Sequence, residues 1–412
     1  MIPRFKPAIT TAELTAAMRP QPDAVPRFEQ AFAAQFGASH GIAFNYGRGG
    51  LFALCKALGL SGAEVIIPAY TCSVVAHAVV VSGNRCRFVD SETGGYNMDL
   101  QQLEAAIGAD TRMVLATHLF GIPADIDRIQ SIVDRAAATW GHKIWIVQDC
   151  AHSFGAEWNG RAVTAAADVA LFGLGISKVM TSIFGGMLTT NNAELAASIR
   201  QYRDTHFTQS SGGKRRGQQA YLVASTIAFS PPCYGFVRWL QDETPLLDGL
   251  TKAYHLDGLI RLPPDALDLM SDVEAQVGLA QLARYRGFAA RRREHARFYR
   301  ANLRPPADWV IPPEVPGTSY SHFPIRVANR DETLKHFLAA GVQLGQLIEY
   351  SMPHLPEYGP AAESEFPNSL SNSRHTINLP VHPDLSDAAR ARVVAQVNVL
   401  PRTVGATDAR VA

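Results

Sequence analysis

Short apolar runs alternate with segments of helical periodicity through the first half of the chain, and this alternation constrains the fold more than any other feature. The strand-like runs cover residues 41–46, 64–68, 85–90, 113–117, 144–147 and 169–173. Helical patterns lie at 51–60, 71–82, 100–107 and 124–139. This order is typical of a mainly parallel sheet that is covered by helices on both faces. The sequence therefore predicts an α/β fold.

The second half of the chain has a different pattern. Residues 212–217 (GGKRRG) form a polar, glycine-rich segment, which we expect to break the regular structure. A long helix is predicted at 272–303, with Arg291, Arg292 and Arg293 on its outer face. Strands and helices then alternate again, at 322–327, 331–340, near Gln343 and at 387–400.

These patterns divide the chain into parts. A length of 412 residues is enough for two or three domains with substantial cores. We expect a large domain, an insertion, a smaller C-terminal α+β domain and a frayed tail. The expected bounds are 1–207 for the large domain, 208–264 for the helical insertion, 265–400 for the small domain and 401–412 for the tail.

The composition narrows the class of protein. Hydrophobic residues make up 47% of the chain and charged residues 18%, as in ordinary globular proteins. The 38 basic and 37 acidic residues nearly cancel, which argues against a general nucleic-acid binder. The five cysteines form no CxxC pair, so we expect no disulfide framework and a reducing cytoplasm. Residues 1–7 lack the apolar core of a signal peptide, and no apolar stretch reaches the roughly 20 residues of a membrane-spanning helix.

A glycine-rich segment, Gly47-Arg48-Gly49-Gly50, separates the first predicted strand from the first predicted helix of the sheet. Ligands of parallel sheets collect at the carboxyl ends of the strands, where this segment lies. Glycines let the backbone approach a ligand, and a helix N-terminus offers free N–H groups and a positive dipole end, which suits a phosphate. Taken alone, the segment is explained as well by a tight turn.

Asp149 directly follows the predicted strand at 144–147, and His152 lies three residues further on. A carboxylate at this position could hold a cationic nitrogen and keep it protonated. Asp149 could equally be the N-cap of a following helix, and His152 could be a structural histidine.

Lys178 follows the next predicted strand and is succeeded by the segment 184–188 (FGGML). In a cleft, desolvation would lower the pKa of this lysine and make it a Schiff-base nucleophile. The simpler alternative is a solvated loop lysine. Together, a phosphate cradle, a carboxylate for a ring nitrogen and an amine for an aldehyde are the three groups that hold pyridoxal phosphate.

Several longer blocks of sequence also follow one another in a characteristic order. They are 28–33 (FEQAFA), 65–71 (VIIPAYT), 88–90 (FVD), 118–125 (HLFGIPAD), 148–156 (QDCAHSFGA), 185–191 (GGMLTTN), 270–272 (MSD), 278–282 (GLAQL) and 379–383 (LPVHP). In these blocks the chain resembles the DegT/StrS family of aminotransferases. That family is a branch of the fold-type-I pyridoxal-phosphate enzymes, and its members often act on nucleotide-linked keto sugars.

The resemblance implies a role for each candidate residue. Lys178 matches the lysine that bonds covalently to the cofactor and moves the proton, and its presence favours transamination over dehydration. Asp149 matches the partner of the ring nitrogen, and His152 matches a residue near the ring face. The cofactor contacts implied in this way come from Gly47, Arg48, Gly49, Cys72, Asp149, His152, Ser177 and Lys178. No metal is implied.

The chain also departs from the family pattern. Cys72 stands where the family usually has an aromatic residue stacked on the cofactor, and Gly173 stands where it has a phosphate-binding serine. Residues 265–271 (DALDLMS) replace G-x-N-x-R-M-S, whose Asn reaches the phosphate in the neighbouring subunit. The Gly-Trp loop near the substrate reads MRPQP at 18–22, and the usual His-Tyr-Pro reads EYS at 349–351.

These features predict a homodimeric, cytoplasmic aminotransferase that uses pyridoxal 5′-phosphate. We expect it to move an amine from an amino acid, such as glutamate, to a nucleotide-activated keto sugar in polysaccharide or antibiotic biosynthesis. One alternative is another pyridoxal-phosphate reaction on a non-sugar keto or amino compound. A second is a non-catalytic binding protein on the same fold. We expect no nucleic-acid partner and no transmembrane segment.

The expected insertion at 208–264 exceeds the usual family length. Two explanations are open: contact with a membrane surface or lipid-linked substrate, or a packed helical pair at the dimer interface or over the active site. Its basic residues, Lys214, Arg215 and Arg216, are expected to meet the diphosphate of a nucleotide substrate. Tyr234 or Trp239 would then cover the base or the sugar.

Overall fold

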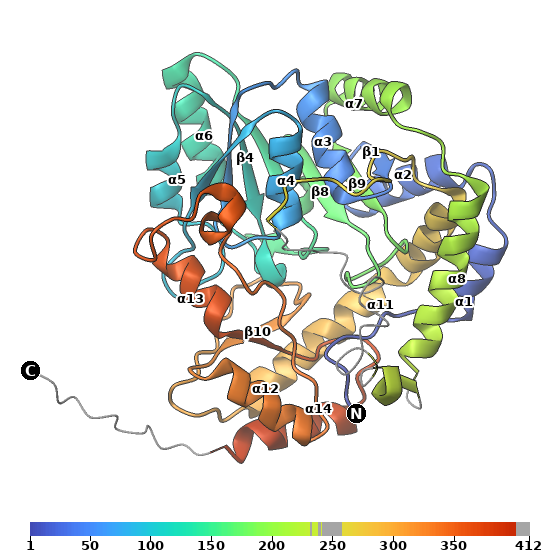
Figure 1. The fold of residues 1–412 in the computed structure, drawn as a ribbon, viewed down its shortest axis with the longest axis vertical. Coiled ribbons are helices and arrows are strands. Elements are labelled where there is room, and N and C mark those ends of the chain that lie inside the picture. The colour runs from blue at the N-terminus through green and yellow to red at the C-terminus, as the bar shows by residue number, and fades with distance from the viewer. Residues whose placement is uncertain (231–232, 238–239, 241–257, 401–412) are drawn as a thin grey trace, which may run out of the picture.

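The computed structural model describes residues 1–230, 233–237, 240 and 258–400. In this part of the chain a seven-stranded sheet, with the strand order β1-β9-β8-β5-β4-β2-β3, forms the centre of the upper half in Figure 1. Its strands are β1 (His40–Phe44), β2 (Glu64–Pro68), β3 (Arg85–Val89), β4 (Thr111–Thr117), β5 (Trp145–Asp149), β8 (Val169–Gly173) and β9 (Gly186–Thr190). Only β9 runs antiparallel to its neighbours, so the prediction of a mainly parallel α/β sheet is confirmed.

Helices cover both faces of this sheet, because successive strand side chains point to opposite faces. Val65 and Ile67 of β2 pack into the core beneath α3, α4 and α7, whereas Ile66 packs into the core beneath α5 and α6. A third core contains the phenylalanines of α2. The helices are α2 (Ala24–Gln35), α3 (Gly47–Ala57), α4 (Ser73–Val81), α5 (Leu100–Ala106), α6 (Ile126–Trp140) and α7 (Ala193–His206).

A smaller sheet and its helices occupy the lower part of Figure 1. Strands β10 (Phe323–Arg326) and β11 (Thr376–Leu379) pair antiparallel. Their neighbours are α12 (Arg330–Ala339), α13 (Pro367–His375) and α14 (Asp387–Asn398). Other short elements are β6 (Glu157–Trp158), β7 (Arg161–Ala162), and the 3₁₀ turns η1 (Leu119–Gly121), η2 (Val163–Ala165), η4 (Met352–His354) and η5 (Pro356–Tyr358).

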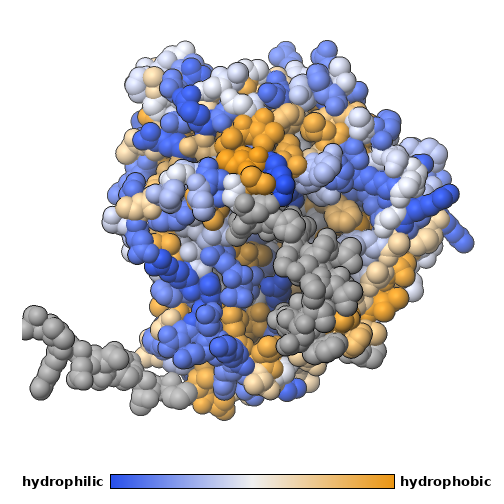
Figure 2. Space-filling model, viewed as in Figure 1, coloured by the Kyte–Doolittle hydropathy of each residue, from blue (hydrophilic) through white to orange (hydrophobic). Residues whose placement is uncertain are grey.

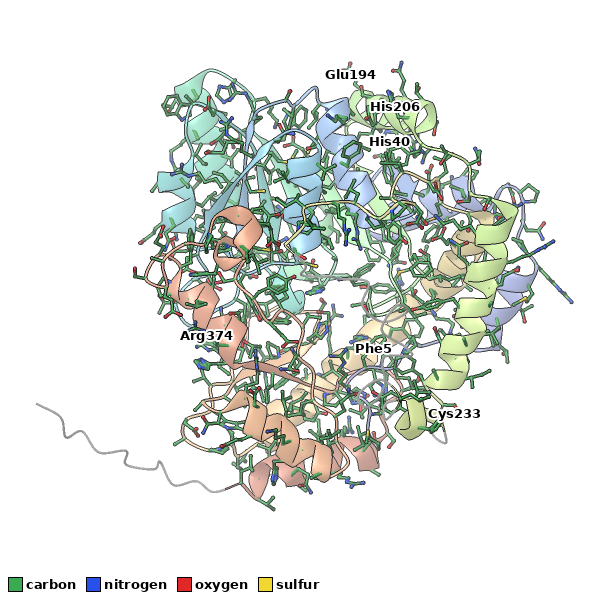
Figure 3. The ribbon with its side chains drawn as sticks, in the orientation of Figure 1. Phe5, His40, Glu194, His206, Cys233 and Arg374 are labelled. Carbon is green, nitrogen blue, oxygen red and sulfur yellow. The ribbon has the colours of Figure 1, made fainter. Side chains whose placement is uncertain are left out.

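The long helix α11 (Asp272–Asn302) runs from the large sheet to the small one (Figure 1). It begins with a capping box: the Ser271 hydroxyl accepts the Glu274 N–H, and the Glu274 carboxylate accepts the Ser271 N–H. Helices α1 (Thr11–Met18) and α8 (Gly212–Ala228) pack beside it. At the far end of α8, Phe229 meets the edge of Phe5, and Phe5 and Cys233 are labelled there in Figure 3.

Three sequence expectations need correction. Residues 212–217 do not break the structure: they form the first turns of α8, which Ser211 caps by accepting the Lys214 N–H at 3.1 Å. Arg292 does not lie on an outer face, since it is only 3% exposed and donates to the Ser321 carbonyl at 2.7 Å. No strand forms near Gln343, where only isolated bridges at Val342 and Gly345 pair the backbone.

Two features are relevant to membrane contact: an apolar surface patch, and the length and hydropathy of the helices. Figure 2 shows hydrophobic side chains gathered over α4, whose sequence is almost entirely apolar. Within the described residues, no helix is both long enough and apolar enough to cross a membrane.

Candidate active site

The parallel pairing of β4, β5 and β8 brings the carboxyl ends of three strands together. Thr117, the last residue of β4, lies directly beside Asp149, the last residue of β5. The Thr117 hydroxyl donates to Asp149 Oδ2 at 3.4 Å, and the Ala151 N–H donates to Oδ1 at 3.1 Å. The neighbouring strand β8 ends at Gly173, two residues after Leu171, which pairs with Asp149. The carboxyl edge therefore holds Asp149 at its centre, as the sequence predicts.

Asp149 is buried, and no helix begins directly after it. Residues 150–156 form turns rather than a helix, so the N-cap alternative is wrong. Burial raises the pKa of Asp149, and the Ala151 N–H and the charge of Lys178 offset that only in part. A cationic group placed against this carboxylate would remove the desolvation penalty.

His152 lies three residues after Asp149 and contacts residues from two other parts of the chain. Its ring stacks on Phe120, with an interplanar angle of 18°, and its Nδ1 accepts the Phe120 N–H at 3.4 Å. The ring of His322, from the start of the small sheet, lies 5.2 Å away between centroids. Burial lowers the pKa of His152 well below its usual value, and the charge of Lys178 adds to this effect. The imidazole is therefore neutral at pH 7.

Lys178 lies in the loop between β8 and β9, facing the same edge. Burial lowers the pKa of its amine, while Cys72 and Asp149 oppose that shift and Arg48 reinforces it. A lysine held this way reaches the neutral, nucleophilic form more easily than a solvated one. The side chain is only partly exposed, so Lys178 is not a fully solvated loop lysine.

Two side chains of α11 accept hydrogen bonds from the loop between β8 and β9, which contains Lys178. Glu274 Oε1 accepts the Gly185 N–H at 3.3 Å, and Gln281 Oε1 accepts the Thr181 N–H at 3.3 Å. Inside the loop, Thr181 donates its hydroxyl to the Leu174 carbonyl at 3.2 Å. Two side chains that lie about a hundred residues further along the chain thus set the position of Lys178.

The glycine-rich segment forms the start of α3. A Cβ on Gly47 would lie 3.0 Å from the Phe172 carbonyl oxygen, so the turn packs tightly against the end of β8. No side chain caps this helix, and Arg48 is the second residue of its first turn, 5.2 Å from the ring of Tyr46. An uncapped helix N-terminus with close-packed glycines and an arginine fits a phosphate group.

The other residues predicted to contact the cofactor or the substrate differ in their exposure and their partners. Cys72 immediately precedes α4 and lies close enough for its charge to influence Lys178. Ser177 is exposed beside the lysine. Lys214, expected at a nucleotide diphosphate, instead forms ion pairs with Asp265 and Asp268. Trp239 lies outside the described residues.

Three further residues of the site are absent from the predicted set. His322 reaches His152 from another sheet, and its pKa is lowered well below the usual value by burial and by the charges of Arg292 and Lys178. Thr117 supports Asp149. The Tyr350 hydroxyl accepts the Ser73 N–H at 2.9 Å, at the start of α4 beside Cys72. Each becomes visible only when distant segments meet.

The sheet topology, with a half-buried lysine and a buried aspartate at its carboxyl edge, defines a protein of the fold-type-I aminotransferase class. The solved structure of AtS13 from Actinomadura melliaura is similar to this fold, with a TM-score of 0.75 at 24% identity over 97% of this chain and 98% of that one. The sugar aminotransferase CalS13 from Micromonospora echinospora has a TM-score of 0.74 at 21% identity, over 97% and 99% of the two chains.

The chain belongs to the DegT/DnrJ/EryC1/StrS aminotransferase family, whose model matches residues 10–227 and 268–398. It is 27% identical over 380 residues to GDP-perosamine synthase of Caulobacter vibrioides, covering 90% of this chain and 88% of that one. It is also 27% identical to dTDP-3-amino-3,4,6-trideoxy-alpha-D-glucose transaminase of Streptomyces venezuelae, over 90% and 85% of the two chains. The family match includes nearly all of α8 and leaves 228–267 unmatched.

Proposed function

We propose that this aminotransferase uses pyridoxal 5′-phosphate to move an amino group from glutamate to a keto sugar linked to a nucleotide. The observation that carries the proposal is the convergence of Lys178, Asp149 and the uncapped start of α3 at one edge of the sheet. Bound there, the cofactor would supply an aldehyde for the amine and a ring that accepts electrons.

Residues of this chain would transfer the proton, hold the ring nitrogen and bind the phosphate. Nζ of Lys178, with its lowered pKa, can take a proton from the α-carbon of the donor and return it on the acceptor side. The Asp149 carboxylate holds a proton on the ring nitrogen, and the neutral His152 ring covers one face of the site. The backbone N–H groups of the first turn of α3, together with Arg48, bind the phosphate.

The sugar substrate is supported by the relatives. The two proteins named above are a GDP-perosamine synthase and a dTDP-amino-sugar transaminase. A third relative, 33% identical over 41% of this chain, is a UDP-N-acetyl-3-dehydro-alpha-D-glucosamine 3-aminotransferase from Acidithiobacillus ferrooxidans. All three names contain a nucleotide-linked sugar, which favours this class of acceptor here.

A non-sugar acceptor remains the second candidate, because one observation favours it. Leu267 and Leu269 stand where the family pattern has Asn and Arg, and both leucines pack against the large hydrophobic core. Two positions of this segment that are polar in the family pattern are therefore apolar in this chain.

The two half-reactions separate these candidates. Purified protein loaded with cofactor is mixed with glutamate, and loss of the visible absorption band is followed. The product form is then mixed with a panel of GDP-, dTDP- and UDP-linked keto sugars, beside small keto acids and keto cyclitols. Return of the band with a nucleotide sugar supports the proposal. Return only with a small keto compound supports the second candidate, and no band in any state refutes both.

We also propose that the enzyme is a cytoplasmic homodimer with the domain bounds expected from the sequence. Dimerisation is favoured by the hydrophobic patch over α4 (Figure 2) and by the exposed Val223, Ile227 and Phe236. All five cysteines are free thiols, which suits a reducing compartment. Sedimentation equilibrium tests the oligomeric state, and limited proteolysis tests the domain bounds.

A further inference from the structure

Lys214 is one of the most heavily paired lysines in the described chain. Its Nζ lies 2.9 Å from Asp265 Oδ2 and 2.8 Å from Asp268 Oδ2. Its side chain is only 16% exposed, whereas that of Asp265 is 37% exposed, so this pair is partly shielded from water. Burial alone would lower the pKa of Lys214, but the two carboxylates outweigh it and raise that pKa.

The two carboxylates belong to the segment 265–271, which we call the strap. Figure 1 shows the chain before α11 crossing in front of α3 and α4 toward the start of α8. Backbone hydrogen bonds join Thr208 to Leu267 and Leu269 on the way. The strap therefore links the start of the helix that carries Lys214 to the large domain.

At its other end, the strap holds the start of α3. Asp265 Oδ2 accepts the Tyr46 hydroxyl at 3.1 Å, and the Asp265 carbonyl accepts Asn45 Nδ2 at 2.9 Å. A Cβ on Gly49 would lie 2.6 Å from the Ala266 carbonyl oxygen. Asp265 thus lies against the same turn that is proposed to bind the cofactor phosphate.

A lone carboxylate at this position would oppose that ligand. Its negative charge would repel a phosphate dianion bound at the same turn. With Lys214 paired to it, the carboxylate can keep its hydrogen bonds to Tyr46 and Asn45 at a much smaller electrostatic cost.

We propose that Lys214 is a positioning residue for the phosphate cradle at the start of α3, where it neutralises Asp265 so that the strap can hold the cradle without repelling a bound phosphate. The proposal rests on the proposed function, in which this cradle takes the phosphate of pyridoxal phosphate. It gives the N-terminal end of α8 a role in cofactor binding that does not require contact with the cofactor.

The test compares two ligands that differ only in the phosphate. Full-length apoprotein is titrated with pyridoxal phosphate and with pyridoxal, and Kd is measured from the absorption of the lysine-bound form. Lys214→Met should weaken pyridoxal phosphate on the order of 10-fold and leave pyridoxal nearly unchanged. Adding Asp265→Asn to Lys214→Met should restore most of the loss, and Lys214→Arg should bind like the wild type.

Two further variants test the inference even if Lys214→Met folds poorly. Asp265→Asn alone should bind pyridoxal phosphate as tightly as the wild type or more tightly, since it removes the repelling charge. Arg215→Met is the matched control, because Arg215 pairs with Asp272 on α11 and not with the strap carboxylate beside Tyr46.

Three outcomes would overturn the inference: an unchanged Kd for Lys214→Met, equal weakening of both ligands, or weakening by Asp265→Asn. Failure of the proposed function looks different, because wild-type apoprotein would then bind neither ligand.

Discussion

Gly173 and Lys178 lie so close that a Cβ on the glycine would be 3.4 Å from Cε of the lysine. The glycine stands where the family pattern has a phosphate-binding serine, and its backbone is ordinary strand without a positive φ. A small side chain at this position thus meets the lysine at about contact distance, without backbone strain.

The first prediction follows from this contact. Gly173→Ser should fold normally and bind pyridoxal phosphate about 10-fold more tightly, because a hydroxyl would add a hydrogen bond to a charged phosphate. Titration of apoprotein measures the change, and Gly173→Ala is the control for steric effects. A weaker Kd in both variants would mean that the lysine is displaced and that no phosphate lies near this strand end.

Lys178 should carry the cofactor. Borohydride reduction of the loaded enzyme should remove the visible band and leave the label on Lys178, as peptide mass spectrometry would show. Lys178→Ala should keep weak cofactor binding and lose about 10²–10⁴-fold in transamination, the range of a general acid–base group. A label on another lysine would overturn the assignment.

Asp149→Asn should separate chemistry from folding. Burial raises the pKa of this carboxyl, so the ionised form costs stability in the apoprotein at neutral pH, and the amide should be at least as stable. Activity should fall on the order of 10²-fold or more, since the ring nitrogen loses its anionic partner. Thermal melting of the apoprotein checks the predicted stability, and steady-state rates check the predicted loss of activity. Normal turnover would refute the role of Asp149.

Glu274 should make stability depend on pH. Burial raises the pKa of its carboxyl to about 7 from 4.5, against the N–H bonds from Ser271 and Gly185. The folded state therefore binds the proton more tightly than the unfolded chain, so the stabilisation is complete below about pH 4.5 and is lost as the pH rises to about 7. The loss corresponds to about 3 kcal/mol.

Glu274→Gln removes this titration. Melting temperatures of the wild type and the variant, taken at intervals between pH 5 and pH 8, should diverge in favour of the variant at high pH. Parallel curves would show that Glu274 does not titrate in this range.

The basic start of α8 should also affect the acceptor. Arg215→Ala combined with Arg216→Ala should raise KM for a nucleotide keto sugar and leave the glutamate half-reaction unchanged, because the donor has no diphosphate. Stopped-flow absorption follows the donor half-reaction alone. A slowed donor step with a normal acceptor KM would refute a role for these arginines in acceptor binding.

The sequence by itself determined the large sheet and the chemical centre of the site. The apolar runs become strands because burial on both faces selects continuous apolar residues, as at Val65, Ile66 and Ile67. Asp149 and Lys178 were recognisable because each follows such a run. Both signals are local, since a few neighbouring residues are enough to produce them.

Tertiary structure alone decided the rest. The glycine-rich stretch before residue 218 lies in a helix that is tied to a distant segment, since Lys214 near its start pairs with Asp265 and Asp268, more than fifty residues later in the chain. Arg292 is buried because the Ser321 carbonyl accepts its guanidinium, and His322 reaches His152 from a different sheet. Local propensity contributes only tenths of a kcal/mol per residue, whereas a buried ion pair or hydrogen bond between distant segments can exceed it. Periodicity therefore predicts the elements, and long-range polar contacts decide how those elements assemble a site.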